Sequence, residues 1–504
     1  MSVQSYNPTT GESSSTGFAE SSATEVAVIC ERARVAADVL AGYPLAWRAA
    51  FLDAIAAALD ADADTIIEVA DAETGLGTAR LTGELKRTCF QFRFFADVVR
   101  DGGFLEASID HPYDSPMGPL PDLRRQLEPL GVIGVFGASN FPLAFSVPGG
   151  DTASALAAGC SVVIKAHPAH PRTSFATFAS IERAARELDA PEGTVSLVFG
   201  LEAGIAVVQD PQVAAVGFTG SYGAGRALFD LAQARAVPIP FYGELGSVNP
   251  LVVSRAAAGE RAASLGEGLV GSVTLGSGQF CTKPGLLFVP EGDEGDVLVS
   301  SAVAALEKGA GATMLSAAIR DRFEAGVASL RDVAGVSHLA TSPRATSDAG
   351  SFAALYHTDV ATLRAQHRSL MTEYFGAVAV FVRYASMDEL LGAIDALEPA
   401  LTFTVQVSEG DVDAPALLVA GRKKAGRVIV NGFPTGVGVS WSMHHGGPHP
   451  AATSSLHTSV GATAIRRWLR PVSYQGVPAA WLPVTLLDDN PLGIPQRVDA
   501  TLRV

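Results

Sequence analysis

The chain has 504 residues, more than one hydrophobic core usually serves, so we expect two or three domains. Apolar residues make up 48% of the chain and charged residues 17%, values that are typical of a globular protein and exclude a disordered one. The 52 Asp and Glu residues outnumber the 36 Lys and Arg residues. The resulting net charge of −16 argues against a nucleic-acid or anionic-membrane partner, because either would repel the protein.

The cysteine count and the N-terminus favour a cytoplasmic protein. Four cysteines in so long a chain do not form a disulfide framework, and none belongs to a C-x-x-C pair. The N-terminus is polar and lacks the basic and apolar regions of a secretory signal. The most apolar stretch, residues 132–147, is interrupted by Gly, Asn and Pro, so no transmembrane helix is predicted.

The first part of the chain is predicted to be helical, because Leu52, Ile55 and Leu59 follow helical spacing in a run that continues toward Gly75. From residue 130 onward, short apolar runs alternate with helical stretches. Strands are predicted at 132–136, 162–164, 195–199 and 214–218, and helices at 151–159, from 173 or 174, and at 226–235. This alternation predicts βαβ units and a parallel sheet covered by helices on both faces.

A second α/β region starts near residue 245, and its apolar runs lie at 286–289, 378–382 and 428–430. The tail from about residue 445 is rich in Gly, Pro and Thr and ends in an extended-looking segment. The sequence contains no internal repeat and no low-complexity linker. The chain is therefore assigned to the α/β class.

Cys281 is the candidate nucleophile. Glycines at 276 and 278 precede it and Pro284 follows, a composition typical of a loop rather than a packed helix or strand. A buried structural cysteine is the ordinary alternative, and the other three cysteines, in apolar or Ala-rich settings, fit that alternative. A thiolate in a loop can attack a carbonyl carbon.

Two polar residues upstream complete the parts that such an attack needs. Glu244 is surrounded by apolar and small residues, so we expect partial desolvation to raise its pKa toward that of a useful general base. Asn140, in Asn-Phe-Pro, could donate its side-chain amide to an oxyanion. Their ordinary alternatives are a surface carboxylate in a turn and a turn-forming asparagine.

Residues 217–225 form a Gly-rich turn between a predicted strand and a predicted helix. The turn matches neither the G-x-G-x-x-G dinucleotide fingerprint nor a P-loop. Simple turn chemistry accounts for such a composition, although N–H groups at a helix start can also hold a pyrophosphate.

Three histidines near the C-terminus, His444, His445 and His449, invite a zinc interpretation. They lack the helical spacing and the flanking carboxylate of known zinc motifs, so no metal is predicted. We expect them to shape a loop on the substrate side.

The order of these motifs and the strand–helix pattern between them resemble the aldehyde dehydrogenase superfamily over nearly the whole chain. Gly278, Gln279 and Cys281 match its Gly-Gln-x-Cys motif. Glu244 begins a match to Glu-Leu-Gly-Gly-x-x-Pro in which Ser247 replaces the second Gly. The resemblance implies a fold with a Rossmann-like cofactor domain, an α/β catalytic domain and a β oligomerisation arm.

In that fold, residues 1–110 and 130–246 would form the cofactor-binding domain and residues 247–445 the catalytic domain. Residues 111–129 and 446–504 would form an arm that pairs subunits into a homodimer or homotetramer. The partner expected besides other subunits is a small-molecule aldehyde, and the reaction is oxidation to a carboxylic acid.

The resemblance also implies roles for single residues. Cys281 would form a thiohemiacetal with the aldehyde, and its own N–H and Asn140 would hold the oxyanion. Glu244 would deprotonate the water that hydrolyses the thioester. The residues implied to bind the nicotinamide cofactor are Lys165, Gly220, Ser221, Gly225, Glu373 and Phe375.

We expect NADP to be preferred over NAD, with NAD still usable. Pro168 stands three residues after Lys165, where many NAD-preferring relatives carry a Glu that would repel a 2′-phosphate. Lys165 supplies a positive charge, and His170 or Arg172 is a further candidate cation.

Within the superfamily, the match is best to a branch that oxidises 2-oxoglutarate semialdehyde to 2-oxoglutarate. Segments such as KAHPAHP, HHGGPHPA and DDNPLGIPQRVD carry it. The far end of that substrate is a carboxylate, for which Lys283 is the candidate cation. NADP-dependent long-chain aldehyde dehydrogenases share some of these sequence segments, so oxidation of a long-chain aldehyde is the main alternative function.

Two other classes remain open. A catalytically inactive structural relative is disfavoured because Asn140, Glu244 and Cys281 are all present. A thiol hydrolase that needs no nicotinamide would require a His partner for Cys281, and the sequence identifies none.

Overall fold

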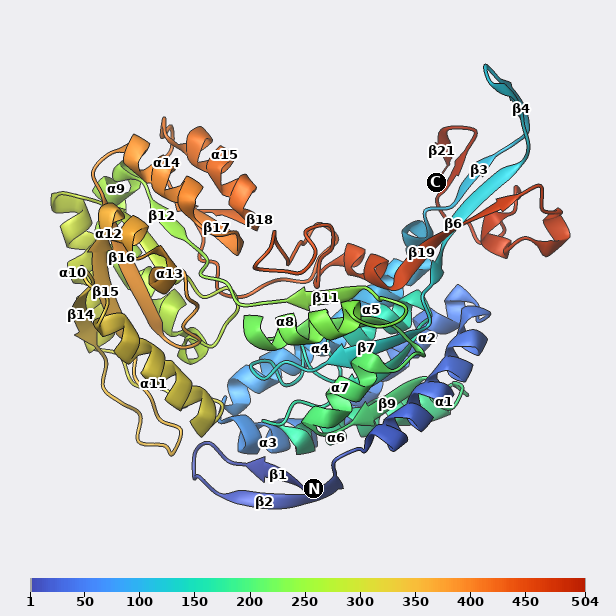
Figure 1. Cartoon of the computed structure of the whole chain (residues 1–504), viewed down its shortest axis with the longest axis horizontal. Coiled ribbons are helices and arrows are strands. Elements are labelled where there is room, and N and C mark those ends of the chain that lie inside the picture. Colours follow the sequence, from blue (N-terminus) through green and yellow to red (C-terminus); the bar gives the residue numbers. More distant parts are fainter. Residues whose placement is uncertain (1, 504) are drawn as a thin grey trace.

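The computed structural model describes residues 2–503, and a fully parallel sheet with the order β11-β10-β7-β8-β9 organises its first half (Figure 1). The strands are β7 (Val132–Phe136), β8 (Ser161–Lys165), β9 (Val195–Val198), β10 (Val213–Thr219) and β11 (Phe241–Glu244). The order of the strands reverses between β7 and β10. Doubly wound sheets bind their ligands at such a switch point, outside the carboxyl ends of the strands.

Helices cover both faces of this first sheet. Successive residues of its strands point to opposite faces, and the apolar side chains on each face pack into a separate hydrophobic cluster. Ile133 and Val162 pack with α2 and α4, whereas Val132 and Val163 pack with α1 and α7. The helices are α1 (Ala23–Ala41), α2 (Leu45–Ala61), α3 (Ala63–Thr74), α4 (Thr78–Asp101), α5 (Gly150–Ala158), α6 (Pro171–Glu187), α7 (Leu201–Gln209) and α8 (Tyr222–Gln233).

A second sheet of seven strands has the order β14-β15-β16-β13-β12-β17-β18, and only β14 runs antiparallel to its neighbour. Its strands are β12 (Leu251–Val253), β13 (Leu286–Pro290), β14 (Ser337–Thr341), β15 (Ala354–Asp359), β16 (Val378–Tyr384), β17 (Ala400–Gln406) and β18 (Ala425–Val430). The helices around it are α9 (Arg255–Thr274), α10 (Asp293–Glu307), α11 (Ala317–Arg331), α12 (Val360–Ala365), α13 (His367–Leu370), α14 (Met387–Ala396) and α15 (Ala414–Lys424).

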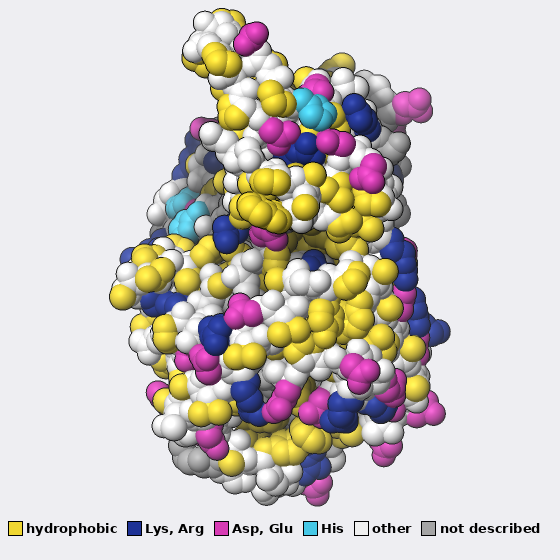
Figure 2. Space-filling model, turned by 90° about the vertical axis from the view of Figure 1, so that its right-hand side faces the viewer, with side chains coloured by type: hydrophobic (Ala, Val, Ile, Leu, Met, Phe, Trp, Pro, Cys, Tyr) yellow, Lys and Arg dark blue, Asp and Glu magenta, His cyan; other side chains and the backbone are white. Residues whose placement is uncertain are grey.

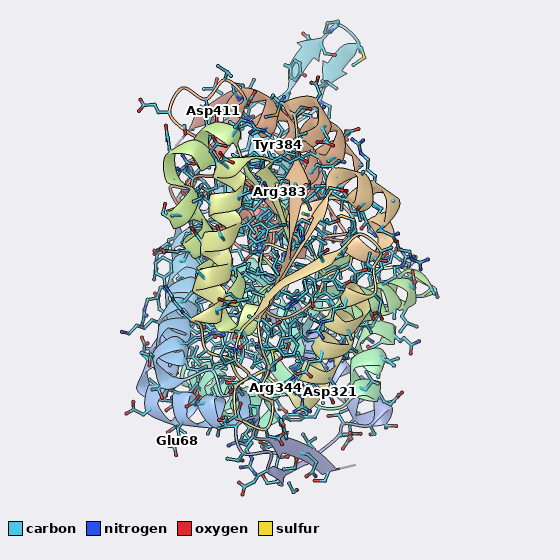
Figure 3. The ribbon with its side chains drawn as sticks, turned by 90° about the vertical axis from the view of Figure 1, so that its left-hand side faces the viewer. Glu68, Asp321, Arg344, Arg383, Tyr384 and Asp411 are labelled. Carbon is cyan, nitrogen blue, oxygen red and sulfur yellow. The ribbon has the colours of Figure 1, made fainter. Side chains whose placement is uncertain are left out.

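Two residues at the end of β16, Arg383 and Tyr384, make polar contacts with neighbouring elements. Figure 3 labels both of them, together with Asp411. The Tyr384 hydroxyl donates to the Val253 carbonyl at 2.8 Å, at the end of β12. Arg383 Nη2 donates to Asp296 Oδ1 of α10 at 2.7 Å. These contacts tie the end of β16 to β12 and to α10.

A third sheet, with the order β19-β6-β3-β20-β21, joins the middle of the chain to its C-terminus. Its strands are β3 (Ser108–Asp110), β6 (Leu123–Pro129), β19 (Leu469–Gln475), β20 (Gln496–Val498) and β21 (Thr501–Arg503). Between β3 and β6, the hairpin of β4 (Tyr113–Ser115) and β5 (Gly118–Leu120) projects from the molecule (Figure 1). A further hairpin, of β1 (Ser2–Tyr6) and β2 (Ser13–Ala19), lies at the N-terminus.

The α/β class and the predicted strands are confirmed, and four helices differ in their boundaries. Helix α8 spans Tyr222–Gln233, so it begins and ends earlier than the predicted 226–235. The helical run toward Gly75 is two helices that break at Asp62. Helix α5 begins at Gly150, one residue before the predicted start, and ends as predicted at Gly159. Helix α6 begins at Pro171 because the distant Glu73 carboxylate accepts the N–H groups of its first turn. None of the helices in residues 2–503 combines the length and hydropathy that a membrane span requires.

Candidate active site

Cys281 lies in a loop between α9 and β13, directly after a short 3-10 helix (Leu275–Gly278). Gly276, Ser277 and Gly278 have φ angles of 56°, 60° and 68°, in the left-handed region that favours glycine. A Cβ at Gly278 would overlap the backbone of Ala377. The buried Gln279 accepts the Leu315 N–H at 3.1 Å. The loop therefore has one tightly defined course up to the thiol.

A buried polar network links this loop to the Glu-Leu-Gly-Ser-Val-Asn-Pro segment. Asn249 Nδ2 donates to the carbonyl of Cys281 at 2.7 Å and to that of Lys283 at 3.1 Å. Ser247 Oγ donates to Asn249 Oδ1 at 2.9 Å and accepts the Leu401 N–H at 3.0 Å. The serine that departs from the superfamily motif thus has a structural use, since it orients the asparagine that holds the nucleophile loop.

Glu244 is the last residue of β11 and is 5% exposed. Its Oε2 accepts a hydrogen bond from Ser459 Oγ at 2.8 Å, and its Oε1 lies 3.0 Å from His445 Nε2. Its backbone carbonyl accepts the Gly220 N–H at 3.1 Å, which connects the carboxylate to the Gly-rich turn. Both carboxylate oxygens therefore have partners inside the protein.

His445 stands between the carboxylate and the thiol. Its imidazole is fully buried, and Nε2 lies 3.5 Å from Cys281 Sγ as well as 3.0 Å from Glu244 Oε1. Sequence reasoning found no His partner for Cys281 because His445 is 164 residues away, and only the fold brings the two together. The sequence feature that could have indicated His445 is the segment rich in His and Gly around it.

The surroundings raise the pKa of the Cys281 thiol and lower the pKa of the Glu244 carboxyl. Burial, and then the negative charge of Glu244, raise the pKa of the Cys281 thiol well above its ordinary value. Burial also raises the pKa of Glu244, but His445 and Ser459 outweigh burial and hold that pKa below its ordinary value. The expectation of a raised pKa for Glu244 was therefore wrong, because the sequence showed the apolar neighbours and not the donors. The resting pair is a protonated thiol beside an ionised carboxylate.

Asn140 follows β7 and is 7% exposed. Its Nδ2 donates to the Gln279 carbonyl at 2.9 Å, which places the amide beside the backbone that leads to Cys281. Arg80 Nη2 donates to the Asn140 carbonyl at 2.7 Å. The amide nitrogen carries a second N–H, so one donor remains for an oxyanion.

The predicted contacts to the adenosine side of the cofactor lie at the carboxyl edge of the first sheet. Ser221 is the N-cap of α8, and a Cβ at Gly225 would overlap Leu245. Gly220 leads directly into this helix start. Lys165 ends β8, and burial lowers its pKa to about 8. In the described part of the chain, no side chain or carbonyl accepts a hydrogen bond from its ammonium group.

The two further cations considered for the cofactor are engaged elsewhere. The His170 ring is buried and bonds to the Ala138 carbonyl at 2.9 Å. Arg172 Nη2 donates to Ser14 Oγ and to the Ser15 carbonyl, both at 3.0 Å, and so holds the N-terminal hairpin. Of the predicted cations, Lys165 is the one left facing the carboxyl edge of the sheet.

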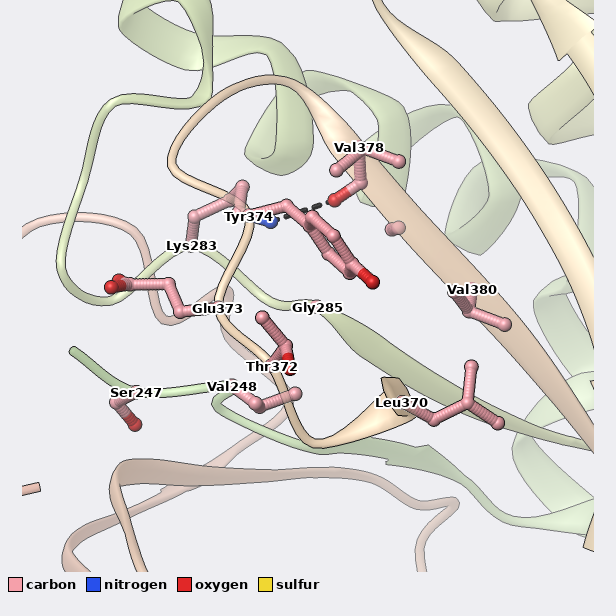
Figure 4. Close-up of a pocket in the computed structure, with 11 residues that line it drawn as sticks. Ser247, Val248, Lys283, Gly285, Leu370, Thr372, Glu373, Tyr374, Val378 and Val380 are labelled. Atoms are coloured by element: carbon pink, nitrogen blue, oxygen red, sulfur yellow. Dashed lines mark hydrogen bonds between the residues drawn. The ribbon is translucent and has the colours of Figure 1, made fainter. Parts of the chain in front are cut away.

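Glu373 and Lys283 line a cavity beside the nucleophile loop (Figure 4). Burial, partly offset by Lys283 and the Ser247 N–H, raises the pKa of Glu373 to about 7. Burial lowers the pKa of Lys283 to about 8, and its Nζ donates to the Val378 carbonyl at 2.7 Å. Phe375 follows Glu373 and is half-buried. Lys283 thus lies with the predicted nicotinamide residue Glu373 and donates to a backbone carbonyl, which argues against its predicted role in binding the substrate carboxylate.

Three side chains of the site also have the donor atoms of a metal ligand set. One atom each from Glu244, Cys281 and His445 lies within 4.8 Å of the others, and among the described residues no further group of three meets this distance. Carboxylate oxygen, thiolate sulfur and imidazole nitrogen together suit zinc. His444 and His449 are not part of this group, so the zinc interpretation of the three histidines finds no geometric support.

Comparisons with known proteins agree with this geometry. The model of the aldehyde dehydrogenase family matches residues 1–471. Alpha-ketoglutaric semialdehyde dehydrogenase 2 of Azospirillum brasilense is 46% identical over 99% of this chain and 95% of its own. Alpha-ketoglutaric semialdehyde dehydrogenase of Acinetobacter baylyi is 41% identical over 90% of this chain and 87% of its own.

Solved structures show the same fold at lower identity. Aldehyde dehydrogenase 21 of Physcomitrella patens has a TM-score of 0.80 at 20% identity and covers 95% of this chain and 96% of its own. An NADP-dependent enzyme of E. coli has a TM-score of 0.80 at 20% identity and covers 94% of each chain. The family model and the two relatives above 40% identity decide the assignment. The chain belongs to the aldehyde dehydrogenase family.

Proposed function

We propose that this enzyme oxidises 2-oxoglutarate semialdehyde to 2-oxoglutarate with a nicotinamide cofactor. The two relatives at 46% and 41% identity carry that substrate in their names, and they align over 99% and 90% of the chain. The observation that supports the chemistry most directly is the cluster of Cys281, His445 and Glu244, with contacts of 3.5 Å and 3.0 Å.

The first half of the reaction is addition of the thiol to the aldehyde. Cys281 gives up its proton to the adjoining His445–Glu244 pair, and its sulfur bonds to the aldehyde carbon. The second N–H of the Asn140 amide and the N–H of Cys281 stabilise the oxyanion that develops. A bound NAD(P) supplies the acceptor for the hydride. Lys165, Ser221 and Gly225 would hold its adenosine and pyrophosphate, and Glu373 the second ribose.

The second half is hydrolysis of the Cys281 thioester. After the first proton has passed to solvent, Glu244 takes a proton from water, whose oxygen attacks the thioester carbon. The carbon–sulfur bond then breaks to release the acid, and the departing sulfur takes the proton back from Glu244. The low pKa of Glu244 means that the carboxylate is ionised, and thus able to accept a proton, over the whole neutral range. His445 keeps that carboxylate oriented through its 3.0 Å contact.

The assignment of parts of the chain to roles is also a proposal. Residues 1–110 and 130–246 bind the cofactor, residues 247–445 carry the nucleophile, and residues 111–129 and 446–504 pair subunits. The support for pairing is the face shown in Figure 2, where hydrophobic side chains gather below the projecting hairpin. The four cysteines are all free, which fits the reducing cytoplasm that a nucleophilic thiol needs.

We propose NADP as the preferred cofactor. Pro168 is exposed and carries no charge, so nothing at that position repels a 2′-phosphate. Lys165 offers a cation without a protein partner in the described chain. Comparing kcat/KM for the two cofactors tests the proposal, and a clear preference for NAD would contradict it.

Two substitutions separate the halves of the reaction. Cys281→Ala should abolish reduction of the cofactor because no covalent adduct can form. Glu244→Gln should give one burst of reduced cofactor per active site and then stall, because the thioester is no longer hydrolysed. Rapid mixing followed by nicotinamide absorbance measures both, with Glu409→Gln, an exposed carboxylate, as the control. Full steady-state turnover in Glu244→Gln would remove that residue from the base role.

The substrate is tested by kcat/KM for 2-oxoglutarate semialdehyde, succinate semialdehyde, glutarate semialdehyde and decanal. The proposal requires the semialdehydes to be preferred. If decanal is oxidised with the highest kcat/KM, a long-chain aldehyde is the substrate instead.

A further inference from the structure

Arg87 is a half-buried arginine of α4 that the reaction described so far does not use. Its Nη2 makes one long hydrogen bond of 3.4 Å to the Val437 carbonyl. Its Nη1 is buried and has no acceptor among the described residues. A buried guanidinium with so few partners is costly for the folded state, so such groups are usually kept for a charged ligand.

The Arg87 guanidinium lies one aromatic ring away from the catalytic cluster. Its Cζ is 4.9 Å from the centroid of the Phe145 ring. The Phe145 ring centroid is also 6.4 Å from the His445 ring, which in turn contacts the Cys281 thiol. The negative groups that act on Arg87 are Glu84 of its own helix and, across the site, Cys281 and Glu244. The Phe145 ring thus neighbours both the Arg87 guanidinium and the His445 ring of the catalytic cluster.

Two other half-buried arginines near the site differ from Arg87 because they make short hydrogen bonds to backbone carbonyls. Arg80 Nη2 donates to the Asn140 carbonyl at 2.7 Å, and its guanidinium lies 5.2 Å from the rings of both Phe141 and Phe280. Arg427 Nη2 donates to the carbonyls of Pro434 and Gly436 at 2.7 Å and 3.0 Å. These two residues position backbone around the site, and each also keeps one buried nitrogen without an acceptor, Arg80 Nη1 and Arg427 Nε. Arg87 differs because it makes no hydrogen bond shorter than 3.4 Å among the described residues.

Glu84 attracts Arg87 by its charge but makes no hydrogen bond to it. Glu84 Oε1 accepts the N–H groups of Leu143 and Ala144 at 2.9 Å and 3.0 Å, so this carboxylate is committed to the segment after Asn140. In residues 2–503, no carboxylate oxygen forms a hydrogen bond with the Arg87 guanidinium. The positive charge of Arg87 is therefore available to an anion that enters the site.

We propose that Arg87 binds the carboxylate at the far end of the substrate and sets the preference for semialdehydes over neutral aldehydes. The inference rests on the proposed function, because it assumes that the aldehyde carbon reaches Cys281. A planar guanidinium presents paired N–H groups that match a carboxylate, which a lysine cannot do. The substrate chain would run along Phe145, with the aldehyde at the thiol and the carboxylate at Arg87.

The test compares one charged and one neutral substrate of equal chain length. Arg87→Met should lower kcat/KM for 2-oxoglutarate semialdehyde by ~30-fold or more, mainly through KM, and change pentanal by less than ~3-fold. Arg87→Lys should recover part of the loss, because it keeps the charge without the paired donors. Lys86→Met, which removes an exposed cation from the neighbouring position of α4, is the matched control and should change neither substrate.

Equal losses on both substrates would assign Arg87 a purely structural role, and no loss on either would also overturn the proposal. A second measurement does not depend on turnover. Calorimetric titration of 2-oxoglutarate into the Cys281→Ala protein should show binding that weakens by ~30-fold or more when Arg87→Met is added. If the native protein oxidised no aldehyde, the proposed function would fail, and this titration would still decide whether Arg87 binds the dicarboxylate.

Discussion

Both contacts of His445, to the Cys281 thiol and to the Glu244 carboxylate, are made by Nε2. This nitrogen can take the thiol proton and pass it to the carboxylate in the tautomer that carries the ring hydrogen on Nδ1. Burial and the charge of Glu244 hold the thiol protonated, and a thiol in that state is a poor nucleophile. The base that removes its proton therefore governs how fast the first bond forms. This reasoning gives His445 a measurable role.

Replacing His445 with Gln should slow alkylation of Cys281 by iodoacetamide at neutral pH and lower kcat by ~100-fold, because general-base help of this kind contributes ~10²–10⁴. The pH profile of alkylation should shift upward in the variant, since only a higher pH then ionises the thiol. His444→Gln, at the adjacent half-buried position, is the control. An unchanged alkylation rate in His445→Gln would exclude the proton-transfer role.

Glu373 should make stability depend on pH. Burial raises its pKa from 4.5 to about 7, so the folded protein favours the neutral carboxyl. The stability that this provides is fully present below pH ~4.5 and is lost as pH rises through about 7. Glu373→Gln should therefore raise the Tm of the cofactor-free protein at pH 8.5 and leave it nearly unchanged at pH 4.5.

Thermal unfolding at the two pH values measures this effect, with Glu409→Gln as an exposed control. A Tm gain of equal size at both pH values would mean that the substitution acts through packing and not through ionisation.

Cys281, Glu244 and Asn140 were predicted from their local sequence motifs, and in the structure the three lie around one loop. Their catalytic roles stay predictions. His445 was missed as a partner because it lies 201 residues after Glu244 in the sequence, and no sequence motif relates the two positions. The pKa of Glu244 was misjudged for the same reason, since its donors come from the C-terminal tail.

Gly225 shows how tightly α8 packs against the strand that carries the base. A Cβ there would overlap Leu245 and come within 3.0 Å of the Phe218 ring. Gly225→Ala should lower the free energy of unfolding by ~1–3 kcal/mol, because a packed contact must shift, and raise the KM for the cofactor. Chemical denaturation and steady-state kinetics measure the two effects.

Gly223 is a matched control on the same helix, because a Cβ there meets no atom within 4 Å. Gly223→Ala should be neutral or slightly stabilising. Equal behaviour of the two variants would show that the close approach at Gly225 is not a constraint.

Strands were easier to predict than helix ends. Val132–Phe136 and Val378–Tyr384 are buried on both faces and therefore read as continuous apolar runs. The start of α6 was placed too late because its first N–H groups are satisfied by Glu73, almost a hundred residues upstream. A helix cap supplied by another element leaves no mark in the local sequence.

The arm exposes apolar side chains that a monomer would leave in water. Met117 on the hairpin is 92% exposed, and Trp481 and Leu502 near the C-terminus are 78% and 56% exposed. If residues 111–129 and 446–504 pair subunits as proposed, Trp481→Glu combined with Leu502→Glu should cause dissociation, because each carboxylate would be buried unpaired in the proposed interface. Light scattering after size exclusion measures the mass.

Val412→Glu is the control, since Val412 is 89% exposed on the second α/β unit. A wild-type protein that is monomeric at micromolar concentration would contradict the pairing role of the arm, whatever the variants do.

Glu244 ends a strand of the first sheet, Cys281 follows a helix of the second unit, and His445 comes from the tail beyond both. The three meet only after the two sheets have docked and the tail has crossed over them. During refolding from denaturant, circular dichroism should therefore recover before activity. A truncated chain, or one that needs a chaperone to fold, can have native-like circular dichroism and still have an unreactive Cys281 thiol. Thiol reactivity is therefore a better measure of native assembly than circular dichroism.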